Sequence, residues 1–180
     1  MHDLAMESAV ILAVPEAEGL VGALRREGDV SAQNGVPAHV TLLYPFVRDP
    51  DEGIVEELRW FFSRVDGFPL TFSSIGEWPE VVYLAPDQAD EVHGLIASLV
   101  RRWPDHQPYD GLFAVEDVVP HLTVVDTPDG ELRAKAKAHL STGLPITCTA
   151  VEASLWVNPG DGWTCHATFP LAEQDGPSTL

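Results

Sequence analysis

The hydrophobic and polar positions of the chain follow two periods in alternation. Short runs of β-forming apolar residues, each bounded by proline, glycine or polar residues, predict strands. These runs cover residues 8–15, 38–46, 68–78, 80–86, 120–128, 145–157 and 162–171. Between them lie segments whose apolar residues recur every three or four positions, as on one face of a helix. The helical segments cover residues 16–27, 49–65, 88–103 and 128–142.

This order of elements repeats. It is βαβαβ, then βαβαβ, then one last strand, and short sequence landmarks recur at corresponding places in the two halves. The matching stretches are LAVP and YLAP (12–15 and 83–86), HVT and HLT (39–41 and 121–123), and PLT and PIT (69–71 and 145–147), with Trp78 and Trp156 following the last pair. The offsets differ between landmarks, which is expected because insertions are tolerated in loops.

We interpret the repeat as a duplication within one α+β domain. The domain is predicted to span residues 1–172, with lobe-level repeats at about 8–78 and 80–157 and a final strand at 162–171. Antiparallel-rich sheets in the two lobes are expected to surround a central cleft. The polar, glycine-containing residues 173–180 are predicted to be a disordered tail.

The repeated His-aliphatic-Thr motif carries the candidate chemistry. Side chains two residues apart in a strand share a face, so His39 and Thr41 should point the same way, as should His121 and Thr123. If each lobe contributes one copy, the cleft holds two imidazoles and two hydroxyls. One neutral histidine can take a proton from water, a protonated one can give a proton to a leaving oxygen, and the threonines can donate to phosphate oxygens.

Composition narrows the class of substrate. The formal net charge is −18, and only 10 lysines and arginines are present, so an extended footprint on long nucleic acid is not expected. A small anion in a local pocket is compatible with this charge, because distant charges are screened over ~8–10 Å. The basic residues near the motifs, Arg48 and Arg133, are few, which favours small nucleotides over RNA ends.

The remaining composition predicts a cytoplasmic protein without membrane segments. No apolar run approaches the ~20 residues of a membrane helix, and the N-terminal stretch MHDLAMESAV lacks the basic start and apolar core of a signal peptide. Two cysteines, Cys148 and Cys165, are too few for a disulfide framework. Adjacent Cys165 and His166 would point to opposite strand faces, so we expect no metal site there and no cofactor.

The motifs HVTLLYPF and PHLTVV, together with the βαβαβ repeat, resemble the two-histidine (2H) phosphoesterase superfamily, in particular its 2'-5' RNA ligase and cyclic phosphodiesterase branch. The resemblance covers about residues 8–170. It implies hydrolysis of a 2',3'-cyclic or 2'-5'-linked phosphodiester of a small nucleotide or short RNA end. It assigns catalysis to His39 and His121 and phosphate binding to Thr41 and Thr123. The chain has no glycine-rich phosphate loop with lysine that would hold ATP.

Several aromatic residues are candidates for lining the cleft. Tyr44, Tyr83 and Trp156 could stack on a base, although each is also suited to a core position. Tyr109 and Phe113, in the loop before the second motif, are candidates for a mobile lid. Two other functions stay open at this point. One is a catalytically silent nucleotide-binding module of the same fold, and the other is a metal-dependent hydrolase.

Overall fold

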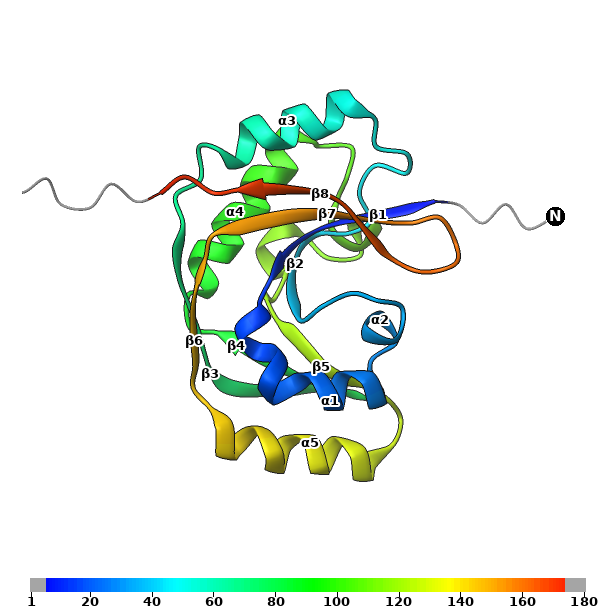
Figure 1. The fold of residues 1–180 in the computed structure, drawn as a ribbon, viewed down its shortest axis with the longest axis vertical. Coiled ribbons are helices and arrows are strands. Elements are labelled where there is room, and N and C mark those ends of the chain that lie inside the picture. The colour runs from blue at the N-terminus through cyan, green and yellow to red at the C-terminus, as the bar shows by residue number, and fades with distance from the viewer. Residues whose placement is uncertain (1–5, 174–180) are drawn as a thin grey trace, which may run out of the picture.

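The computed structural model describes residues 6–173 of the chain (Figure 1), where they form a mixed α+β fold. The strands are β1 (Glu7–Ala13), β2 (His39–Leu43), β3 (Phe68–Trp78), β4 (Val81–Pro86), β5 (Leu122–Asp126), β6 (Ile146–Ala150), β7 (Glu152–Asn158) and β8 (Thr164–Pro170). The α-helices are α1 (Glu18–Gly28), α2 (Val30–Gln33), α3 (Glu52–Phe62), α4 (Ala89–Arg102) and α5 (Gly130–Gly143). Short 3-10 turns lie at Pro15–Ala17, Pro108–Gly111 and Val115–Asp117.

The strands form two antiparallel sheets of four. One sheet has the order β2-β1-β7-β8, and the other has the order β5-β4-β3-β6. The predicted strand at residues 145–157 is therefore two strands, because β6 joins the second sheet and β7 joins the first. The sequence shows no break there, since both halves are runs of β-forming residues, and the chain crosses between the sheets at the exposed Val151.

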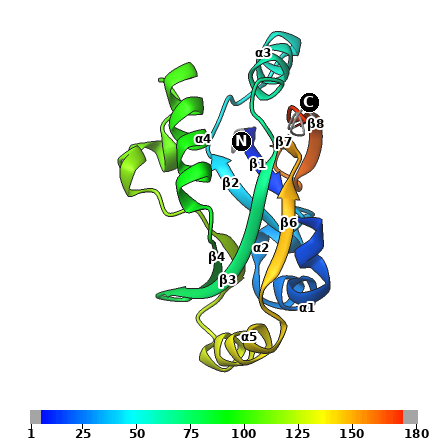
Figure 2. The same ribbon diagram turned by 90° about the vertical axis from the view of Figure 1, so that its left-hand side faces the viewer.

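The two sheets interlock. β3 pairs with β4 of the second predicted repeat, and β7 pairs with β1 of the first. β3 also lies beside β6, where Thr71 is opposite Thr147 (Figure 2). These threonines belong to the PLT and PIT stretches of the two predicted repeats. Each repeat thus ends in a strand that extends the sheet begun by the other.

Helices α1, α3 and α4 also pack mainly against elements outside their own predicted repeat. α1 packs against β5 and α5, whereas α4 packs against β2 and α3 packs against β8. In Figure 1, α3 lies above β8 at the top of the molecule, and α5 lies below α1 at the bottom. β2 and β5, the edge strands of the two sheets, also contact each other. Both histidine motifs are therefore brought to the place where the sheets meet.

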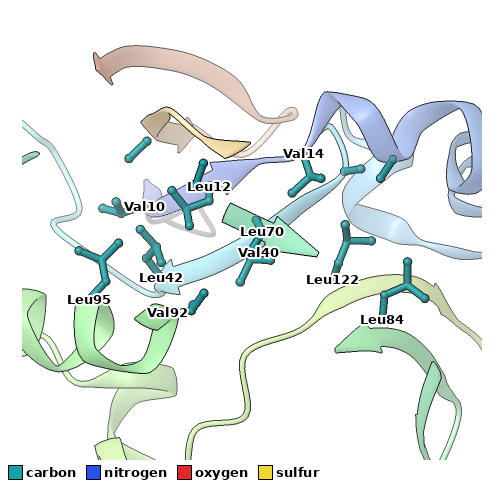
Figure 3. Close-up of a cluster of buried hydrophobic side chains, with 14 of the residues drawn as sticks. Val10, Leu12, Val14, Val40, Leu42, Leu70, Leu84, Val92, Leu95 and Leu122 are labelled. Carbon is teal, nitrogen blue, oxygen red and sulfur yellow. The ribbon is translucent and has the colours of Figure 1, made fainter. Parts of the chain in front are cut away.

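One hydrophobic core joins both sheets. In the close-up of Figure 3, Leu12 of β1 and Leu42 of β2 lie with Leu95 of α4, and Leu84 and Leu122 of the second sheet extend the same cluster. Within β2, Val40 and Leu42 are buried in this core, while His39 and Thr41, which alternate with them, face the other side of the sheet. A core shared between the sheets fixes the relative position of the two edge strands.

Local capping explains two differences from the predicted elements. α3 begins after Asp51, whose side chain accepts a hydrogen bond from the amide of Ile54, whereas the predicted helical segment starts at residue 49. α2 lies in a segment predicted as loop, and Asp29 caps it by accepting from the amide of Ser31. Among residues 6–173 no helix is long and apolar enough to cross a membrane. The predictions for the extreme N-terminus and for the tail beyond Glu173 lie outside the described residues.

Candidate active site

The first histidine motif lies on the outward face of β2. His39 and Thr41 are both partly buried, and they alternate with the core residues Val40 and Leu42, as the strand period requires. Across the ladder to β1, His39 is opposite Ala13 and Thr41 is opposite Ile11. The two polar side chains therefore lie on one face of the sheet, above small and apolar neighbours.

A backbone carbonyl fixes the His39 ring. Its Nδ1 atom lies 2.7 Å from the carbonyl oxygen of Pro37. Since a carbonyl only accepts, Nδ1 carries the proton in the neutral ring, and Nε2 is left with the lone pair. The peptide segment that bears this carbonyl is held on both sides. The Arg25 guanidinium donates to Val36 O at 3.1 Å, and the amide of Ala38 donates to Glu18 Oε1 at 2.6 Å.

Arg25 is itself fully buried within a charged cluster. Its Nη2 atom lies 2.8 Å from Asp29 Oδ2, four residues away on the chain, and 3.1 Å from the Ser31 hydroxyl. Asp29 is 5% exposed, so both charges of this ion pair are withdrawn from water and compensate each other. The cluster ties the end of α1 to the loop that leads into β2.

The second histidine motif is held in a parallel way. His121 directly precedes β5, and its Nδ1 atom lies 2.8 Å from the carbonyl oxygen of Val119. Two aromatic rings contact the imidazole, with centroids 4.7 Å away for Trp78 and 5.6 Å away for Tyr83, both near edge-to-face. Thr123 follows in β5, where it is opposite Tyr83 in the ladder to β4.

Burial favours the neutral form of both imidazoles. Desolvation is the main cause that lowers the pKa of His39 from 6.5 to about 4, and the positive charge of Arg25 adds to it. The same cause lowers the pKa of His121. A smaller part of the lowered pKa of His39 comes from His121 itself, so the two rings interact electrostatically. An anion bound between them would offset these effects and favour protonation of one ring.

Each histidine lines a cavity of its own. The His39 cavity has a volume of about 390 Å³ and includes Thr41, Tyr44, Trp156 and Trp163 in its wall. The His121 cavity has a volume of about 410 Å³, with Trp78, Tyr109 and Phe113 in its wall. Both volumes fall in the range of ~300–1,000 Å³ that is usual for small-ligand sites.

The residues selected from the sequence are divided between these cavities. Tyr44 and Trp156 line the first, while Tyr109 and Phe113 line the second. Tyr83 and Thr123 are part of neither wall as described. Tyr83 instead packs against a wall residue of the second cavity, because the centroid of its ring lies 4.1 Å from that of Trp78.

Sequence reasoning missed several residues at the site. Trp78 appeared only as a landmark of the repeat, although its ring contacts His121. Arg25 was expected only as one residue of the predicted helical segment 16–27. Its signal was the carboxylate of Asp29 at the i+4 position, which pairs with it across one helical turn. Trp163, which falls in the predicted strand at 162–171, lies instead in the loop before β8, from which it lines the His39 cavity.

The cysteines and His166 stand apart from both cavities. Cys148 lies in β6 of one sheet and Cys165 lies in β8 of the other. Within residues 6–173, no group of three or more histidine, cysteine, aspartate or glutamate side chains is arranged to hold a metal ion.

Comparisons with known proteins agree with this architecture. Crystal structures of E. coli LigT superpose on the chain with TM-scores of 0.55 for its complex with 3'-AMP and 0.56 for the apo form, at 18% and 19% identity. Both alignments cover 93% of this chain, and they cover 99% and 98% of the respective LigT chains. The crystal structure of TT0787 of Thermus thermophilus gives a TM-score of 0.54 at 16% identity, over 93% of this chain and 99% of that one.

A search of curated proteins found no significant match. The sequence model of the 2'-5' RNA ligase superfamily, by contrast, matches residues 13–162, which include both histidine motifs and all four strands of the second sheet. With this match over most of its length, the chain belongs to the 2'-5' RNA ligase superfamily of two-histidine phosphoesterases.

Proposed function

We propose that this protein hydrolyses a 2',3'-cyclic or 2'-5'-linked phosphodiester of a small nucleotide, using His39 and His121 as general acid and base and no metal ion. The proposal is based on the equivalent positions and hydrogen bonds of the two imidazole rings. His39 begins β2 and His121 directly precedes β5, two strands that contact each other, and each ring has its Nδ1 atom bound to a carbonyl two residues earlier. In both rings this leaves Nε2 as the atom that can exchange protons with a substrate.

In the proposed reaction, water attacks the phosphorus atom while the P–O bond to the leaving group breaks. One neutral imidazole takes the proton of the water, and the other, protonated when the anionic phosphate is bound, gives its proton to the leaving oxygen. Thr41 and Thr123 donate hydrogen bonds to the non-bridging oxygens. Family resemblance favours His121 over His39 as the base, and the residues themselves leave the two roles open.

The substrate class follows from charge and from the fold relatives. The chain has net charge −18, which disfavours long nucleic acid. The LigT structure with 3'-AMP is a complex with a small nucleotide, and this supports a nucleotide-sized substrate here. Both cavities are of a size suited to one nucleoside.

The test is turnover of 2',3'-cyclic nucleotides and 2'-5'-linked dinucleotides in excess chelator. We expect hydrolysis to persist with chelator, to be lost in His39→Ala and in His121→Ala, and to survive in His166→Ala, which replaces an exposed histidine on β8. Loss with chelator and recovery with a divalent ion would instead indicate a metal-dependent hydrolase. Binding of these nucleotides without turnover by the parent would indicate a nucleotide-binding module.

A further inference from the structure

A groove outside both histidine cavities lies between α3 and α4. It has a volume of about 430 Å³ and shares no wall residue with either cavity. Its wall includes Trp60, Phe61 and Val65 on the α3 side and Gly94, Leu95 and Ser98 on the α4 side. The groove is therefore a surface feature that the proposed chemistry does not use.

A tryptophan is held in an exposed position at the border of this groove. Trp60 is 55% exposed. The guanidinium of Arg64 lies 3.9 Å from the centroid of its indole ring and also donates to the Trp60 carbonyl at 3.2 Å. Tryptophan and arginine are enriched where one protein binds another, because they bury much surface with little loss of side-chain freedom. This border of the groove thus has the composition of a protein-binding surface.

The outward side of α4 leaves room for a second helix. Gly94 and Ser98 are one helical turn apart, and both line the groove. A Cβ atom at Gly94 would have no atom within 4 Å. Because the distance between packed helices depends on the side chains at their contact, small residues here allow a close approach.

The charges of α4 are ordered along the helix. Asp90 and Glu91 lie in its first turn, and Arg101 and Arg102 lie in its last, so acidic and basic residues balance in a chain of net charge −18. The ion pairs within residues 6–173 include neither Glu91 nor Arg101. Arg101 instead donates to the Ser98 hydroxyl at 2.7 Å, which places its guanidinium beside the small residues of the groove.

This order of charges is complementary to itself. When two copies of α4 lie antiparallel about an axis midway between Gly94 and Ser98, each of these residues faces the other, and Glu91 of each copy faces Arg101 of its partner. The positive end of each helix dipole then lies beside the negative end of the other. Two copies with a net charge of −18 repel each other elsewhere. A face of balanced charge is therefore where they are able to associate.

We propose that this face binds a second copy of the chain, in a two-fold symmetric dimer whose α4 helices pack antiparallel at Gly94 and Ser98. Each copy presents the same patch to the other, as a two-fold axis requires. Trp60 of each copy flanks the α4 helix of the other and is covered by it. The dimer does not depend on the proposed function, because the groove shares no wall residue with the histidine cavities.

Sedimentation equilibrium of the full chain at concentrations up to about 0.5 mM tests the dimer. We expect the parent to dimerise reversibly. Glu91→Arg and Arg101→Glu each place like charges opposite each other at two symmetry-related contacts, so each should lower the dimer affinity by about tenfold or more. An equimolar mixture of the two variants should recover the affinity of the parent, because each new charge then faces an opposite charge on the other copy. Recovery would also show that both variants are folded.

Gly94→Leu fills the space where the helices meet and should lower the dimer affinity by about tenfold or more. Gly19→Leu is the matched control, because Gly19 is an exposed glycine of α1 that also has no atom within 4 Å of a new Cβ. It should leave the dimer unchanged. A dimer that both charge variants leave intact, or a mixture that fails to recover, would overturn the proposal. A parent that stays monomeric at every concentration would overturn it in favour of a different protein partner for the groove.

Discussion

The imidazole of His39 is bound to the carbonyl of Pro37, with Nδ1 and the oxygen 2.7 Å apart. His121 has the same relation to Val119, again two residues earlier and at 2.8 Å. In each case the chain just before the motif selects the tautomer of the ring, so that Nε2 has the free lone pair. The motif is therefore longer than His-aliphatic-Thr, since the carbonyl that precedes it by two residues is part of the arrangement.

The paired rings lead to a prediction about combined mutations. His39→Ala and His121→Ala should each lower kcat on a cleaved diester by about 10²–10⁴-fold, because each removes one proton-transfer group. The double variant should lose much less than the product of the two losses, since both groups act in one step. Thr41→Ala and Thr123→Ala should each cost less than either histidine variant. Steady-state kinetics at saturating substrate measures all five, and strictly multiplicative losses would contradict a shared step.

Burial of His39 predicts a loss of stability in acid. Its pKa is about 4 in the folded protein and 6.5 for the unperturbed group, so the unfolded chain binds the extra proton between these values. Stability therefore falls as pH falls from 6.5 to about 4, with no such penalty above pH 6.5. The full cost below pH 4 is on the order of 3 kcal/mol.

Urea unfolding at pH 7 and at pH 4.5 measures this cost. His39→Gln, which keeps an amide donor for the Pro37 carbonyl, should reduce the difference in unfolding free energy between the two pH values by about 2–3 kcal/mol. His166→Gln replaces an exposed histidine and should leave the difference as in the parent. An unchanged pH dependence in His39→Gln would show that the imidazole is not held neutral in the folded protein.

Glu18 offers a test of how the His39 ring is positioned. Its Oε1 atom accepts from the amide of Ala38 at 2.6 Å, and the carbonyl that fixes His39 belongs to the preceding residue. Glu18→Ala should lower kcat by about tenfold or more with little change in KM, because small displacements of a catalytic group are costly. Glu18→Gln keeps an acceptor oxygen of the same shape and should retain most of the activity. If Glu18→Gln lost as much activity as Glu18→Ala, the negative charge near Arg25 rather than the hydrogen bond would be responsible for the loss.

Much of this fold could be predicted from the sequence, because the spacing of its apolar residues fits the period of a strand or of a helix in most segments. The alternation in β2 sends Val40 to the core and His39 outward, and this is readable from the residues alone. Thr71 and Thr147, which come from the PLT and PIT stretches of the sequence, lie opposite each other across β3 and β6. The exchange of strands between the sheets was not readable, since β6 and β7 form one unbroken β-forming run whose halves differ only in their partners.

The residues that surround the candidate site were harder to predict from the sequence. Arg25 and Arg26 are identical as residues, and only the three-dimensional position of Asp29 and Val36 decides that the first is buried and the second exposed. The aromatic walls come from segments far apart in the chain, such as Trp78 and Phe113 around one histidine. Such contacts depend on tertiary structure, and no local period encodes them.

Gly76 provides the last prediction, because Tyr83 occupies the space where a side chain would be. Gly76 is opposite Tyr83 in the ladder between β3 and β4, and a Cβ atom at this glycine would overlap the tyrosine ring. Since that ring contacts both Trp78 and His121, its displacement should disturb the His121 imidazole. Gly76→Ala should therefore destabilise the protein by about 1–3 kcal/mol through overpacking, and should lower kcat/KM by about tenfold or more.

Gly94→Ala is the matched control for this substitution. Gly94 lies on the exposed side of α4, with no atom within 4 Å of the position of a new Cβ. Alanine there should stabilise the helix by about 0.5–1 kcal/mol and leave kcat/KM unchanged. Thermal unfolding and steady-state kinetics on both variants make the comparison. If Gly76→Ala kept parental activity while losing stability, Tyr83 would be a packing residue only, and the contact between its ring and His121 would have no part in catalysis.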